Sequence, residues 1–117
     1  MNVVLLRGVL SRTADRRTLA SGSELLQLDL STPTVTGVAT VPVVWFDPPS
    51  SAEFDLGSEV VVLGEVRRRF FRAAGSTQSR TEVVADRIIR ASNRRGVAGV
   101  LSQATRLMNG DGDERRR

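Results

Sequence analysis

Five strand-like runs, separated by turn-forming residues, constrain the fold of this 117-residue chain more than any other feature. The second run shows the pattern most clearly. There Leu26, Leu28 and Leu30 alternate with polar residues, and a period of two is typical of a half-buried strand. Clusters of glycine, proline and serine between the runs supply turns. We therefore expect strands at residues 3–10, 24–30, 39–46, 57 to 69 or 71, and 80–90.

The segments between these runs are predicted to be loops. Residues 12–19 are polar, and residues 32–37 contain a proline and a glycine. Residues 73–78 are rich in small and polar side chains, so we expect a flexible hairpin tip there.

Three local features refine these predictions. Gly8 interrupts the first run and predicts a bulge or a close approach of two backbones, and Pro42 predicts an edge or bulge position. After the third run, Ser50 or Ser51 is a candidate cap for a single helical turn that ends near Phe54.

The hydrophobic period changes near the C-terminal end. Apolar residues recur there at helical spacing and predict an amphipathic helix that Asn109 and Gly110 end. This helix has three possible uses: packing on the rest of the domain, pairing with another subunit, or binding a partner. We expect packing within the assembly. The apolar stripe consists of Val97, Val100, Leu101, Ala104, Leu107 and Met108.

The order of these elements predicts an all-β fold. Helices and strands do not alternate, so a parallel α/β sheet is excluded. Five strands with a long late hairpin predict a small five-stranded Greek-key barrel of the OB type, followed by the C-terminal helix. We expect the barrel domain at residues 1–92, a basic linker at 93–96, the helix at 97–109 and a disordered tail at 110–117.

The composition excludes several kinds of chemistry. The chain has no cysteine and no histidine, so thiolate nucleophiles, His-ligated zinc and Ser-His catalysis are impossible within it. No clustered pair of carboxylates stands out. We therefore expect a protein that is not an enzyme and needs no cofactor or metal.

All 17 basic residues are arginine, and their distribution is uneven. The simplest interpretation of this preference is codon usage in a GC-rich genome, but arginine still offers bidentate phosphate contacts and stacking that lysine lacks. Residues 67–95 contain nine arginines against two acids, whereas residues 1–66 contain four arginines against eight acids. This asymmetry indicates a basic surface with an anionic partner.

No part of the sequence predicts insertion into a membrane. No apolar run approaches the roughly 18 residues of a membrane span, and no basic segment precedes the short apolar run at the N-terminus. We expect a cytoplasmic, nucleoid-associated protein with no membrane partner.

The segment from Val66 to Arg72 is the strongest functional signal. Because neighbours on a strand alternate, Arg67, Arg69 and Phe71 share one face, and the opposite face carries Arg68 and Phe70. Cations beside an aromatic ring on a strand are typical of single-strand nucleic-acid binders. The alternative interpretation is a hairpin with one buried phenylalanine and a solvated basic edge. Under either interpretation, one of the two rings is expected to be buried.

Several segments together resemble one family, the bacterial single-stranded DNA-binding proteins. The similarity covers roughly residues 2–90 and is most specific in the last two strands. The segments are residues 2–10 (NVVLLRGVL), 21–32 (SGSELLQLDLST), 43–46 (VVWF), 57–60 (GSEV), 67–71 (RRRFF), Gly75 and 80–84 (RTEVV).

The resemblance implies roles for particular residues. Phe46 and Phe71 match positions where the family has base-contacting aromatic side chains. Arg67, Arg69 and Arg72 would meet phosphates along the hairpin, and Arg80 starts the returning strand. The family's first strand pairs with its symmetry mate, which makes a possible oligomer interface of Val3, Val4, Leu5 and Leu6.

The sequence departs from the family at several points. Thr40 stands where the family often has tryptophan, and the loop between the second and third strands carries no aromatic residue. Arg115, Arg116 and Arg117 end the chain in place of an acidic tip. We therefore expect this divergent, short member not to recruit proteins in the family's usual way. Trp45, which alternates with Phe46, is expected to be a core or subunit-interface residue.

The function predicted from these features is sequence-independent binding of single-stranded DNA in replication, recombination or repair. The partners are the single strand, further copies of the chain in a dimer or tetramer, and a possible paralogous single-stranded DNA-binding protein. Two alternatives remain open: an OB-fold oligomerisation or interaction module with weak or no DNA binding, and an RNA binder.

Overall fold

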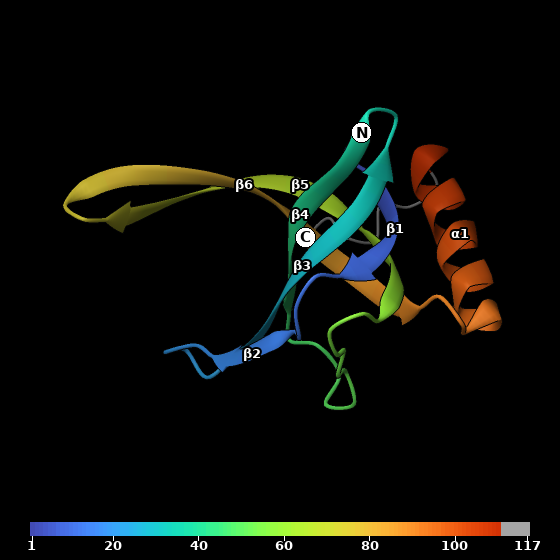
Figure 1. Cartoon of the computed structure of the whole chain (residues 1–117), viewed down its shortest axis with the longest axis horizontal. Helices are drawn as coiled ribbons and strands as arrows, with labels where there is room; N and C mark the ends of the chain where they lie inside the picture. The colour runs from blue at the N-terminus through green and yellow to red at the C-terminus, as the bar shows by residue number, and fades with distance from the viewer. Residues whose placement is uncertain (111–117) are drawn as a thin grey trace.

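The computed structural model describes residues 1–110, which form a β-barrel with one helix on its outside (Figure 1). Residues 111–117, which include most of the predicted tail, lie outside the described part. The elements follow the order predicted from the sequence, with one additional strand. They are β1 (Val4–Leu10), β2 (Asp15–Thr18), β3 (Glu24–Thr34), β4 (Gly37–Phe46), β5 (Glu59–Ala73), β6 (Ser76–Arg90) and α1 (Arg94–Met108).

Five of these strands close a barrel, and β2 extends the sheet at its edge. The strands lie in the order β1-β5-β6-β4-β3-β2, and β1 also pairs with β3, which closes the ring. The pairing of β4 with β6 is parallel, whereas the other pairings are antiparallel. This connectivity is that of the five-stranded Greek-key OB barrel, so the predicted fold class is confirmed.

Closure of the barrel depends on Gly8. β1 pairs with β5 from Val4 to Val9, and then Val9 and Leu10 pair with β3. A Cβ atom on Gly8 would overlap the carbonyl oxygen of Ser31 in β3. The predicted close approach of two backbones at Gly8 is therefore confirmed, and it lies where β1 changes partners.

Apolar side chains form two layers, one inside the barrel and one beneath α1. Leu26, Leu28 and Leu30 lie in the barrel core, as their alternation predicts. On the outer face of β5, Val61 and Leu63 pack against Val100, Ala104 and Leu107 of the helix. The expected packing of the helix within the molecule is thus observed on the barrel of its own chain.

The helix begins earlier than the sequence predicts. Asn93 caps it by accepting a hydrogen bond from the backbone N–H of Gly96, so α1 starts at Arg94. The predicted linker at residues 93–96 is wrong, because the side chain of Asn93 satisfies a backbone N–H in the first turn and lets the helix begin at Arg94. The arginines at 94 and 95 carry no apolar pattern that would have indicated this first turn.

Other boundaries also differ from the predictions. Residues 15–18, expected in a loop, form β2 because they pair with residues 24–27 of β3. Residues 32–34 and 37–38 extend β3 and β4, so the predicted loop shrinks to residues 35–36. A turn at Ser50 and Ser51 replaces the predicted helical turn. There Arg16 of β2 donates hydrogen bonds to the carbonyl oxygens of Pro49 and Ala52, which hold the chain in an irregular path.

The paired strands β5 and β6 project beyond the barrel as a long arm (Figure 1). The tip is a two-residue turn in which Ala74 and Gly75 both have positive φ, 51° and 79°. Phe70 is 67% exposed and Phe71 is 37% exposed. The prediction that one ring is buried is wrong, because this part of the hairpin extends past the core that would cover it.

Candidate nucleic-acid interface

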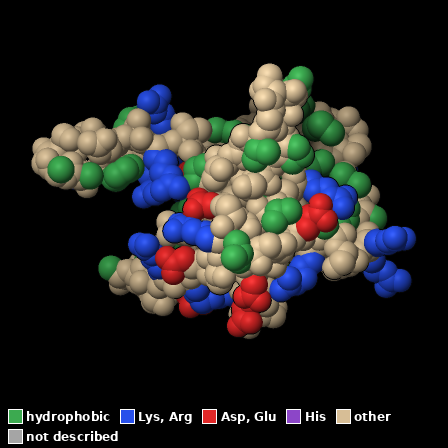
Figure 2. Space-filling view, in the orientation of Figure 1, with side chains coloured by type: hydrophobic (Ala, Val, Ile, Leu, Met, Phe, Trp, Pro, Cys, Tyr) green, Lys and Arg blue, Asp and Glu red, His purple; other side chains and the backbone are tan. Residues whose placement is uncertain are grey.

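A groove of about 530 Å³ lies between the projecting hairpin and the outer face of the sheet. Figure 2 shows a hollow between the hairpin arm and the region of β2, with arginine side chains on both sides. Four segments line the groove. They contribute Arg12, Arg17 and Leu19 from residues 11–23; Leu25, Gln27, Leu28 and Asp29 from β3; Val43, Val44 and Phe46 from β4; and Arg69, Phe71, Arg80 and Glu82 from the hairpin.

The register of the hairpin gathers the predicted residues on its groove face. Arg69 lies opposite Arg80, and Arg67 lies opposite Glu82. Directly opposed residues of an antiparallel pair point to the same side, so Phe71 joins these side chains at a spacing of two from Arg69. The predicted grouping of Arg67, Arg69 and Phe71 is therefore present, and Arg80 adds a third cation.

Two arginines lie over aromatic rings at this face. The guanidinium of Arg67 is 5.1 Å from the ring centroid of Phe46, and that of Arg69 is 5.4 Å from the ring centroid of Phe71. Each contact is worth about 0.5–1 kcal/mol at an exposed site. The two phenylalanines expected to contact bases thus already hold cations, and they remain 38% and 37% exposed.

Glu82 forms ion pairs with the same two arginines. Its side chain is buried, and Oε2 lies 3.3 Å from Nε of Arg69 and 3.8 Å from Nη2 of Arg67. Arg69 also donates a hydrogen bond of 3.4 Å to Oε1 of Glu82. A buried carboxylate is costly unless cations and donors surround it. Arg67 and Arg69 supply the cations, but Oε2 of Glu82 accepts no hydrogen bond from the described residues.

Arg80 and Arg72 lie in different surroundings. Among residues 1–110, Arg80 forms no ion pair or hydrogen bond, so its charge is available at the groove. Arg72 donates a hydrogen bond to the carbonyl oxygen of Gly75, and strand alternation places it on the opposite face with Arg68 and Phe70. The hairpin therefore separates the predicted phosphate-contacting arginines onto two faces.

The groove also includes residues that the sequence reasoning missed. Arg12 forms a 2.7 Å ion pair with Asp29, and Arg17 forms a 3.0 Å ion pair with Asp15. Leu25 and Gln27 of β3 also line the groove. The alternation of β3 is a usable signal for both, because residues that alternate with the buried leucines face outward.

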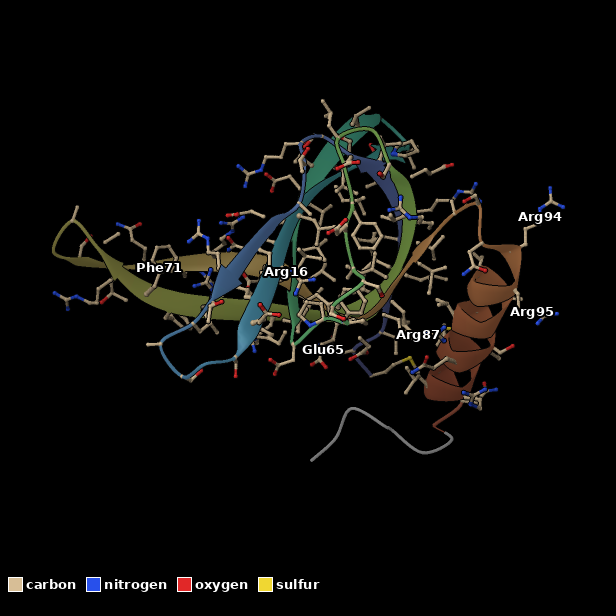
Figure 3. The ribbon with its side chains drawn as sticks, turned by 90° about the horizontal axis from the view of Figure 1, so that it is seen from below. Arg16, Glu65, Phe71, Arg87, Arg94 and Arg95 are labelled. Carbon is tan, nitrogen blue, oxygen red and sulfur yellow. The ribbon has the colours of Figure 1, made fainter. Side chains whose placement is uncertain are left out.

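Two other arginines lie far from this groove. Figure 3 shows Arg94 and Arg95 at the start of α1, across the barrel from Phe71. Arg94 and Arg95 therefore belong to the surface around α1 and not to the groove.

Within the described part of the chain, the predicted oligomer interface at residues 3–6 has one exposed large apolar side chain and one free backbone edge of β1. Val4 and Leu6 pack against the barrel core, and Val3 packs against the layer beneath α1. Leu5 is 42% exposed. β1 pairs with β3 only at Val9 and Leu10, so residues 4–6 leave one backbone edge without a strand partner among the described strands.

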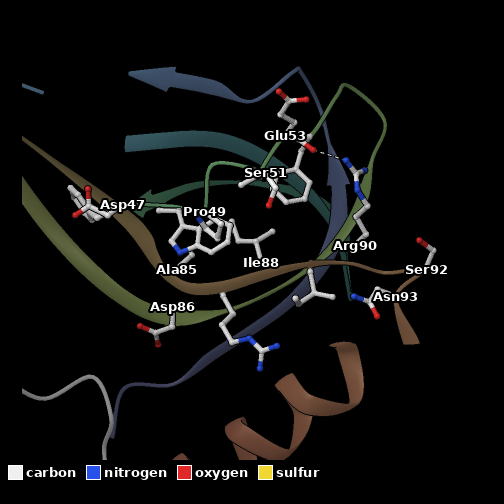
Figure 4. Close-up of a pocket in the computed structure, with 16 residues that line it drawn as sticks. Asp47, Pro49, Ser51, Glu53, Ala85, Asp86, Ile88, Arg90, Ser92 and Asn93 are labelled. Atoms are coloured by element: carbon white, nitrogen blue, oxygen red, sulfur yellow. Dashed lines mark hydrogen bonds between the residues drawn. The ribbon is translucent and has the colours of Figure 1, made fainter. Parts of the chain in front are cut away.

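A larger cleft of about 850 Å³ lies on the other side of Phe46, beneath residues 47–54 (Figure 4). Trp45 borders it and packs against the barrel core, as expected for a core residue. Arg90 there donates a hydrogen bond to the carbonyl oxygen of Glu53 and lies 5.1 Å from the ring centroid of Phe54. The lining contains three carboxylates against two arginines, so this cleft is less suited to an anion than the groove.

Comparison with known proteins does not assign a family. No protein-family model matches the chain, and no curated protein matches it. Within residues 1–110, no helix is long and apolar enough to cross a membrane, and no group of three or more acidic residues is placed to hold a metal ion.

Proposed function

We propose that this chain is a non-enzymatic protein that binds single-stranded DNA without sequence preference. The observation that carries the proposal is the position of the groove on the barrel. Counting only the five barrel strands, β3 and β4 are the second and third, and their outer face lines the groove. OB barrels bind oligonucleotides on this face, between the loop after the first strand and the loop between the last two.

The side chains in the groove supply both kinds of contact that a single strand needs. Arg69 and Arg80 line the groove and offer charge to phosphates, and Phe46 and Phe71 offer rings to bases. Arg67 does not line the groove itself, but it lies over the ring of Phe46 and adds a third cation beside it. Stacking of a base on an aromatic side chain contributes about 1–3 kcal/mol and tolerates any base. With two rings at the groove, we expect a short contact region on each chain. Roles in replication, recombination or repair are part of the proposal only through the resemblance to bacterial single-stranded DNA-binding proteins.

A titration of fluorescently labelled oligo-dT with the full chain, followed by anisotropy, tests the proposal. We expect saturable binding that single-stranded DNA competes away and that duplex DNA of the same length competes away poorly. A matched oligo-rU competitor separates DNA binding from RNA binding, since the groove offers arginines and rings to either strand. Absence of saturable binding to oligo-dT at low salt would refute the proposal.

The second candidate function is assembly through β1. The backbone edge at residues 4–6 and the exposed side chain of Leu5 favour strand addition by a second copy or a paralogous chain. Light scattering with and without a long oligonucleotide tests it. A Leu5→Glu variant that stays folded should shift the mass toward a monomer, whereas an unchanged monomeric mass in both proteins would exclude this role.

A further inference from the structure

Glu82 holds an unusual position for an acidic residue at a nucleic-acid groove. It is 2% exposed, and it borders the groove between two arginines that the proposed function assigns to phosphates. A carboxylate is chemically similar to a phosphate in how it accepts from guanidinium groups. Glu82 therefore occupies, inside the protein, the kind of position on Arg67 and Arg69 that a bound phosphate would take.

The same two arginines cover the rings that bases would use. Arg67 lies between Glu82 and Phe46, and Arg69 lies between Glu82 and Phe71. A base cannot stack on a ring face that a guanidinium already covers. Movement of the two guanidinium groups toward solvent would free the covered face of Phe46 and the covered face of Phe71 together. The side chains of Arg67 and Arg69 are 45% and 40% exposed, so they have room to make this movement.

We propose that Glu82 is an internal competitor for the phosphates of the single strand and thereby lowers the affinity of the groove. In the unbound protein Glu82 holds Arg67 and Arg69 over Phe46 and Phe71. On binding, phosphates draw the two guanidinium groups outward, and bases take their places on the rings. This inference rests on the proposed function, and it adds a residue that sets the strength of binding.

Substitution Glu82→Gln tests the competition. Glutamine keeps the size of the side chain and an oxygen that accepts from Arg69, but it removes the charge that competes with phosphate. We expect affinity for oligo-dT to rise roughly three- to tenfold at low salt, from the loss of one close charge repulsion. The slope of log affinity against log salt should steepen by about 0.7, the contribution of one further neutralised phosphate on a single strand.

Glu59→Gln is the matched control. Glu59 also forms an ion pair with an arginine, Arg7, but neither residue lines the groove. The control variant has the same gain in net charge, so a general electrostatic effect would raise affinity equally in both variants. We expect Glu59→Gln to leave affinity and salt slope close to those of the wild type.

The outcomes separate this inference from the function on which it rests. If the wild type binds oligo-dT and folded Glu82→Gln binds equally or more weakly, Glu82 is structural and the competition is refuted. If the wild type does not bind, the proposed function fails and the inference falls with it. Should Glu82→Gln not fold, the carboxylate ¹³C resonance of Glu82 in the wild type decides. It should shift on saturation with oligo-dT, and an unchanged resonance would refute the exchange.

Discussion

The two halves of β5 differ in what surrounds them, although they belong to one continuous strand. In residues 60–64 every side chain is buried, because one face meets the barrel core and the other meets α1. In residues 67–72 the side chains are exposed or half-buried, because the hairpin has left the barrel. Asn2 marks the boundary, since its side chain accepts from the N–H of Val66 and donates to its carbonyl oxygen.

This difference indicates that the first half of β5 stabilises the fold and the second half carries the proposed binding surface. Substitutions in residues 60–64 should change the free energy of unfolding, whereas substitutions on the groove face of residues 67–72 should change binding. A hairpin that projects from a barrel has few side chains of its own to bury, so it can carry arginines and rings at little cost to the core. Effects on stability and effects on binding should therefore separate along β5 as the burial does.

Leu63→Ala should give the largest effect and should act on stability. Leu63 is fully buried in the layer beneath α1, so truncation loses apolar contact and leaves a cavity. We expect the free energy of unfolding to fall by about 2–5 kcal/mol in a denaturant titration. The folded fraction should bind oligo-dT as the wild type does. A weaker affinity in the folded fraction would mean that the barrel layer and the groove are coupled.

Phe71→Ala should act on binding and leave stability nearly unchanged. Loss of the ring removes one stacking platform, so we expect a loss of about 1–3 kcal/mol of binding free energy in the anisotropy titration. Phe70→Ala is the matched control, because Phe70 is the neighbouring ring on the opposite face and is more exposed. Equal losses for the two variants would contradict the assignment of binding to the groove face.

Arg80→Ala should reduce the salt dependence of binding. Arg80 has no ion pair among residues 1–110, so its charge is free to neutralise a phosphate. The slope of log affinity against log salt should become shallower by about 0.7 for a single strand. Arg68→Ala, which removes the same charge from the other face of the hairpin, should leave the slope nearly unchanged. The account would be contradicted if Arg68→Ala had the larger effect.

Ala74→Asn should give the smallest effect. Ala74 has a positive φ of 51° at the hairpin tip, and asparagine tolerates this conformation better than alanine. We expect a gain of about 0.5 kcal/mol in the free energy of unfolding, with unchanged affinity for oligo-dT. A marked change in affinity would place the tip itself in the interface.

The sequence predicted the fold well, because the barrel strands carry strong local patterns. The alternating leucines of β3 and the helical stripe of α1 both encode burial directly, and Gly8 marked the close approach that closes the barrel. The face shared by Arg67, Arg69 and Phe71 was predictable for the same reason, since a period of two depends only on the strand.

The remaining features depend on contacts between segments far apart in the sequence. β2 has no apolar pattern, and it forms because β3 supplies its partners. The burial of Glu82 depends on Arg67 and Arg69 across the hairpin. The exposure of both Phe70 and Phe71 depends on how far the hairpin extends past the core. No local pattern carries this information.

Photo-crosslinking of the wild-type chain to an oligonucleotide that contains 5-iododeoxyuridine tests the central claim most directly. Mass spectrometry of the digested complex then identifies the residues that contact bases. The groove assignment predicts adducts at Phe71 and Phe46. Adducts at Phe70 or on α1, with none at Phe71 and Phe46, would contradict it.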